Sequence, residues 1–124
     1  VKRAIDDSNN RRIEAIEDFD FSVMDALEDV GLPDFNAPLH SETPGLIIDR
    51  LTIPALKIYH LRAELEETNG TIDEDVINIK LLSATEQFED LTECFDRLFN
   101  DIAKGKASIK MYKQIKIYDN DLSD

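Results

Sequence analysis

The chain has 124 residues, 42% hydrophobic and 33% charged, and its 14 Lys and Arg against 27 Asp and Glu give a formal net charge of −13. This composition indicates one globular domain and excludes a general binder of nucleic acid or membrane surfaces, because an acidic surface repels phosphate groups and anionic lipid. A single Cys and two His exclude an intrachain disulfide framework or zinc site.

The first predicted element is a helix over residues 1–30. Its apolar stripe at helical spacing consists of Ile13, Ile16, Val23, Leu27 and Val30. Asp20 interrupts this stripe, and Ser22 leaves open whether the segment is one long helix or two. Gly31 and Pro33 predict its end. The following residues, through Glu42, are predicted to form a loop because they contain two prolines.

The second predicted helix is TPGLIIDRLTIPALKIYHLRAELEE, from Thr43 to Glu67. Thr43 is a good N-cap, and Pro44 suits the first helical position. The apolar stripe consists of Ile47, Leu51, Pro54, Ile58, Leu61 and Leu65. Pro54 lies inside the helix, where it removes one backbone hydrogen bond.

The opposite face of this helix mixes charged and apolar residues. It carries Asp49, Ile53, Leu56, Lys57, His60, Glu64 and Glu67. A helix that is apolar on two sides is usually packed between neighbours, so we expect the polar residues of this face, Asp49, Lys57, His60 and Glu64, to be partly buried and to need partners or a ligand. Ordinary surface pairing at i,i+4, as between His60 and Glu64, is the alternative.

A third helix, about 50 Å long, is predicted from Ile72 to Lys104. Its apolar stripe is the most regular in the chain and consists of Ile77, Leu81, Ala84, Phe88, Leu91, Phe95, Leu98 and Ile102. This spacing is typical of a helical bundle.

The segment Ser108–Tyr118 fits both a helical face and a partial strand alternation, and we favour a short helix. It overlaps the stretch from Lys104 to Lys116, which contains five lysines and no acidic residue. Lys110, Tyr112 and Lys113 are therefore candidates for binding an anion such as a phosphate or a sugar nucleotide, with a tyrosine stacking on the base of the nucleotide. The alternative is that these lysines dock on the acidic helices of the same molecule.

These elements predict an all-α fold: an antiparallel helical bundle of three long helices plus a short C-terminal segment, in a single domain over residues 1–124. The central helix is apolar on two sides, and a bundle of three helices provides few neighbours to cover both sides. We therefore expect either a further helix before Val1 or a second chain.

Two kinds of catalytic chemistry have weak signals. The acid pairs Glu64/Glu67 and Glu93/Asp96 resemble superficially those of helical, magnesium-dependent nucleotide pyrophosphohydrolases, but pairs at this spacing are expected by chance in so acidic a chain. Cys94 adjoins the apolar stripe of the third helix, where a half-buried thiol is inert. No catalytic residue and no metal site is assigned, and a binding role is favoured over an enzyme.

Three stretches together resemble an uncharacterised bacterial family, domain of unknown function 4254. They are VKRAIDDSNNRRIEAIED, NAPLHSETPGLIIDRLTIPALKIYH and DIAKGKASIKMYKQIKIYDND. Within the family's central-helix pattern, the matching residues are Asp49, Arg50, Lys57, Tyr59 and His60, whereas Pro54 departs from it. The resemblance implies an additional N-terminal helix before Val1 and a genomic setting beside glycosyltransferases of cell-surface polysaccharide synthesis. It transfers no catalytic residue.

The sequence thus predicts a cytoplasmic binding or accessory protein with a polar site on its central helix. The candidate ligand-binding residues are Asp49, Arg50, Lys57, His60, Glu64, Lys110, Tyr112 and Lys113. A homo-oligomer, such as a dimer, and an anionic small molecule are the partners considered, and the cofactor is unknown. The alternatives are a magnesium-dependent hydrolase of nucleotides or sugar nucleotides and an oligomeric scaffold without a ligand site.

Overall fold

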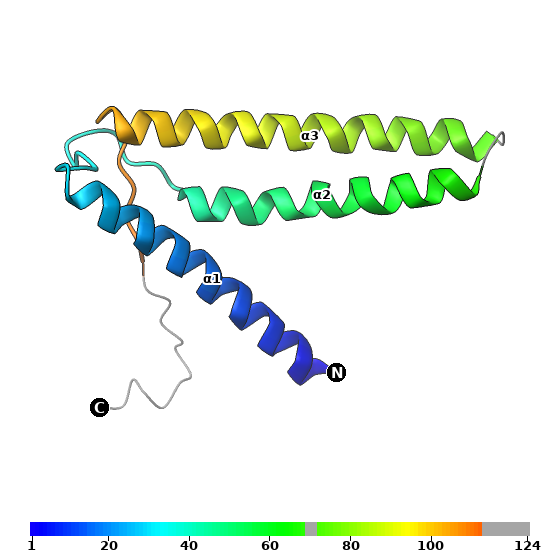
Figure 1. Cartoon of the computed structure of the whole chain (residues 1–124), viewed down its shortest axis with the longest axis horizontal. Helices are drawn as coiled ribbons and strands as arrows, with labels where there is room; N and C mark the ends of the chain where they lie inside the picture. Colours follow the sequence, from blue (N-terminus) through cyan, green and yellow to red (C-terminus); the bar gives the residue numbers. More distant parts are fainter. Residues whose placement is uncertain (69–71, 113–124) are drawn as a thin grey trace.

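The computed structural model describes residues 1–68 and 72–112, and this part of the chain forms three α-helices and no sheet. Helices α2 (Pro44–Glu67) and α3 (Ile72–Ala103) run antiparallel, side by side, as a long hairpin (Figure 1). Helix α1 (Lys2–Glu28) contacts α2 near the start of α2 and diverges from the hairpin toward its own N-terminus (Figure 1). The predicted all-α fold with three long helices is confirmed.

Helix α1 is one continuous helix, which answers the question that Ser22 left open. It ends where Gly31, at a φ of 75°, turns the chain in the left-handed conformation. The backbone amides of Gly31 and Leu32 donate to the carbonyls of Glu28 and Leu27 at 3.0 and 2.9 Å. These bonds satisfy carbonyls that the helix end leaves unpaired.

Helix α2 begins as the sequence predicts. Thr43, in extended conformation, caps it by accepting a hydrogen bond from the amide of Leu46 at 3.3 Å. Pro44 follows at the first helical position. The helix continues through Pro54, which is buried.

Helix α3 buries the predicted stripe most completely at Ile77, Ala84, Leu98 and Ile102. Phe88, in the middle of the stripe, is exposed. The first turn of α3 carries three acidic residues, and their negative charge interacts favourably with the positive end of the helix dipole. The helix is followed by Gly105 at a φ of 72°.

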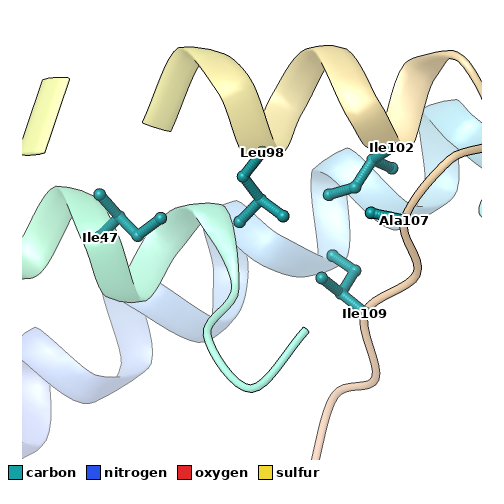
Figure 2. Packing of buried hydrophobic residues seen from close by; sticks show 5 residues of the cluster. All are labelled: Ile47, Leu98, Ile102, Ala107 and Ile109. Atoms are coloured by element: carbon teal, nitrogen blue, oxygen red, sulfur yellow. The ribbon is translucent and has the colours of Figure 1, made fainter. Parts of the chain in front are cut away.

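The core lies where the end of α3 meets the start of α2 and the segment after α3. Its buried residues are Ile47, Leu98, Ile102, Ala107 and Ile109 (Figure 2). Met24 and Leu27 of α1 and Phe95 of α3 pack against it. Packing is therefore concentrated at one end of the molecule, and the hairpin extends from this end as two helices.

The predicted short helix after α3 is wrong for the described residues 108–112, which are not helical. Ser108 instead forms an isolated parallel β-bridge with Leu39. The amide of Ser108 donates to the carbonyl of Pro38 at 2.9 Å, and its carbonyl accepts from the amide of His40 at 2.8 Å. This pairing extends the chain and places Ile109 fully in the core. Residues 113–118 of the predicted element lie outside the described part.

Candidate functional site

A buried carboxylate joins α1 to the start of α2. Asp20, which is 2% exposed, accepts hydrogen bonds from the hydroxyl of Thr43 and from the backbone amide of Gly45, the latter at 2.8 Å. The negative charge thus meets the positive end of the α2 dipole and free N–H groups of its first turn. The residue that interrupts the apolar stripe of α1 is therefore a capping group for another helix.

Gly45 is required by this contact. A Cβ atom placed on Gly45 would lie 2.8–2.9 Å from the carboxylate atoms of Asp20. Such a distance is shorter than van der Waals contact, so α1 approaches α2 this closely only because position 45 has no side chain.

Ion pairs engage two residues of the predicted polar site. Asp49 of α2 pairs with Arg12 of α1 at 3.3 Å, and its side chain is 25% exposed. Arg50 pairs with Glu42, in the preceding loop, at 2.8 Å. Both contacts tie α2 to neighbouring parts of the same chain, so these two side chains have structural partners.

Further along α2, an open groove of about 700 Å³ lies between α2 and α3. We call it the α2–α3 groove. The residues that line it are Ile53, Leu56, Lys57, His60, Leu61, Lys80, Ser83, Ala84 and Gln87. Ile53 and Leu56 are 55% and 59% exposed and lie three residues apart on α2, so they form an adjacent apolar pair rather than isolated exposed side chains.

The groove is basic in an otherwise acidic molecule. Among the described residues that line it, Lys57, Lys80 and His60 are ionisable, and none is acidic. With 27 acids in 124 residues, about two acids would be expected among nine lining positions. Within the described part of the chain, neither lysine forms an ion pair. The groove therefore has an apolar floor and cationic groups available to an anion.

The groove continues the side of α2 on which α1 packs. Asp49, Ile53, Leu56 and His60 follow one another at spacings of four, three and four residues, which places them on one stripe of the helix. Asp49 holds α1 through Arg12. Because α1 then diverges (Figure 1), the next three residues of the stripe are left exposed.

The predicted lysine and tyrosine segment lies elsewhere. Lys110 and Tyr112 line a smaller hollow of about 220 Å³ beside α1, together with Asp20, Thr43 and others. This hollow shares no lining residue with the α2–α3 groove. Lys113 lies outside the described residues.

The structure thus distributes the predicted site residues over several places. Partial burial, which we expected for the polar face of α2, is found for Asp49 and is wrong for Lys57, His60 and Glu64, which are exposed. Lys57 and His60 are brought together in the groove. The sequence prediction did not include Lys80. Its position beside the apolar stripe of the third helix, which was predicted to run antiparallel to α2, could have indicated it.

The residues considered for catalysis lie on open surface. Cys94, expected to be half-buried, is exposed. Glu64, Glu67, Glu93 and Asp96 are exposed as well, and Glu93 pairs with Arg97 at 2.8 Å. Among residues 1–68 and 72–112, no group of three or more His, Cys, Asp or Glu side chains is arranged to hold a metal ion.

The fold and the groove define a class: a small all-α protein with an open, helix-lined apolar groove that carries basic side chains. The comparison with protein families then places it more narrowly. The family model described as Protein of unknown function (DUF4254) matches residues 1–111, and the chain belongs to this family. No curated protein and no solved structure matched the chain. None of the described helices has the length and apolar character needed to cross a membrane.

Proposed function

We propose that this chain is a binding or accessory protein whose ligand-binding surface is the α2–α3 groove. The partner combines apolar surface with negative charge. The observation that carries the proposal is the combination of half-exposed Ile53 and Leu56 with Lys57, His60 and Lys80, in a lining without a described acid.

Energetic considerations support this location. Covering the exposed part of Leu56 or Ile53 would contribute on the order of 1 kcal/mol each. Lys57 and Lys80 come from different helices, so an anion between them would also hold α2 against α3. The proposed site keeps Lys57 and His60 from the sequence prediction. It omits Asp49 and Arg50, because their charges are already paired.

Binding of anilinonaphthalene sulfonate, an apolar dye with one negative charge, tests this proposal. Lys57→Gln with Lys80→Gln is expected to weaken dye binding about tenfold. Lys104→Gln with Lys106→Gln is the matched control, because it removes the same charge from exposed positions outside the groove. Circular dichroism verifies that each variant keeps its helices. Equal affinities of both double variants for the dye would refute the proposal.

A second candidate, an oligomeric scaffold such as a dimer, is favoured by one observation. Ile79 and Leu82 of α3 are exposed large apolar residues outside the groove lining. Sedimentation velocity tests it: concentration-dependent association that Leu82→Asp abolishes supports a scaffold, and a monomer at all concentrations counts against it.

The proposal includes a biological setting for the protein. A bacterial, cytoplasmic protein linked to surface polysaccharide synthesis is consistent with the single cysteine and with the gene context that the family resemblance implies. Neither consideration identifies the partner, which depends on the chemistry of the groove.

A further inference from the structure

We infer that the α2–α3 groove accepts an acidic amphipathic α-helix from another polypeptide. The inference rests on the proposed function and specifies the partner of that same surface. The dimensions of the groove, the side of α2 on which it lies and its charge all favour such a helix.

The dimensions suit a helix. The lining runs from Ile53 to Leu61 on α2, about 12 Å, and from Lys80 to Gln87 on α3, about 10 Å. Two turns of a docked helix have this length and present three apolar side chains at i, i+4 and i+7. The exposure of Ile53 and Leu56 leaves the groove open along its length rather than closed around a small molecule.

The position of the groove also indicates a helix. The stripe that begins at Asp49 already supports one helix, α1, through the pair with Arg12. Where α1 diverges, the stripe continues through Ile53 and Leu56 without a covering element in the described chain (Figure 1). A helix laid there would restore a third helix beside α2 and α3 over the outer part of the hairpin.

The charge selects an acidic helix. Where α1 contacts α2, the basic residue is Arg12 of α1 and the acidic residue is Asp49 of α2. In the groove, α2 and α3 themselves provide the basic residues, which are Lys57, Lys80 and His60. The exposed first part of α1, residues 1–12, carries four basic and two acidic side chains. Its positive sign makes this part of α1 a poor occupant, in the same molecule or in a second copy.

Among its described residues, a second copy has more than one acidic, partly apolar stripe: Asp18, Phe21, Asp25 and Glu28 form one on α1, and Asp75, Ile79, Leu82 and Glu86 form another on α3. Such a stripe could reach the groove of another copy, in a reciprocal dimer or in an open chain of copies. Each copy has a formal net charge of −13, however, and the repulsion between two such chains opposes their association. The charge of the whole chain therefore favours a helix from another polypeptide.

A displayed library of helical peptides tests the inference. Each peptide carries Leu at i, i+4 and i+7, and the flanking positions are randomised among Glu, Lys and Gln. Selection on the wild-type chain is expected to enrich Glu over Lys at least about threefold, and the enriched peptides should bind the Leu56→Asp variant about tenfold more weakly. Lys57→Glu with Lys80→Glu is expected to reverse the selected charge.

Three results would overturn the inference: no enriched helix, enrichment without a preference for Glu, or enriched peptides that bind Leu56→Asp as well as wild type. Sedimentation of the chain alone adds a fourth, since self-association abolished by Leu56→Asp would assign the groove to a second copy. If the dye experiment succeeds and the selection fails, the groove remains a ligand-binding surface and only the helical partner is refuted.

Discussion

The carboxylate of Asp20, within α1, accepts a hydrogen bond from the backbone amide of Gly45, in the first turn of α2, at 2.8 Å. The same carboxylate accepts from the hydroxyl of Thr43, the N-cap of α2. One buried side chain thus fixes where α2 begins relative to α1. Together with the Arg12–Asp49 pair, this contact holds α1 against the start of α2, and the groove lies further along α2.

Replacing Asp20 by Ala is expected to lower the free energy of unfolding by about 2–4 kcal/mol, because the buried hydroxyl of Thr43 and the amide of Gly45 lose their acceptor. Asp20→Asn keeps an acceptor oxygen and should cost less. Urea denaturation measures both, and Asp18→Asn, at an exposed position on the same helix, is the control. A loss below about 0.5 kcal/mol for Asp20→Ala, typical of surface substitutions, would contradict this role.

Gly45→Ala is expected to destabilise the protein by about 1–3 kcal/mol, because its Cβ would overlap the Asp20 carboxylate. The cost should fall in the Asp20→Ala background, where the overlapping atoms are absent. A double-mutant cycle by urea denaturation measures this coupling.

Gly31→Ala is the control for this cycle. It introduces strain from a positive φ, and nothing lies within 4 Å of the added Cβ. Its cost should therefore add to that of Asp20→Ala. Additive costs for Gly45→Ala and Asp20→Ala would show that the two positions are not in contact.

Ile109→Ala should cost about 2–4 kcal/mol of unfolding free energy, since Ile109 is 0% exposed and belongs to the core. Thermal or urea denaturation measures it, with Tyr112→Ala, at an exposed position three residues further on, as the matched truncation. Equal stabilities of these two variants would mean that the segment after α3 does not complete the core.

Hydrogen exchange should separate α1 into two parts. The side chains of residues 1–12 are all exposed, including that of Arg12, which pairs with Asp49, and the first turn has no acidic residue to stabilise the helix dipole. Their amides are expected to exchange far faster than those around Asp20. Mass spectrometry of peptic fragments measures this, and protection of residues 1–12 equal to that of α3 would show that they have a partner in solution.

The local signals in the sequence predicted the helices well. Thr43 with Pro44 and the glycine after α1 act within one turn of the chain, so their effects follow from sequence alone. The prediction failed at Ser108, because a backbone pairing with Leu39, distant in sequence, overrides the local pattern. Only the tertiary structure could show this contact.

The site was predicted in part for the same reason. Lys57 and His60 lie on one helix and could be found from its periodicity. Lys80 of α3 lies in the same groove, and its place there depends on the register in which α3 packs against α2. Asp20 interrupts an apolar stripe, and its role depends on Gly45, 25 residues away.

The most direct test of the binding surface is the amide chemical-shift map of isotope-labelled protein titrated with anilinonaphthalene sulfonate. The largest changes are predicted between Ile53 and Leu61 and between Lys80 and Gln87, and they should be lost when Lys57 and Lys80 are both replaced by Gln. Changes centred instead on Lys110 and Tyr112, beside α1, would contradict the assignment of the α2–α3 groove as the ligand-binding surface.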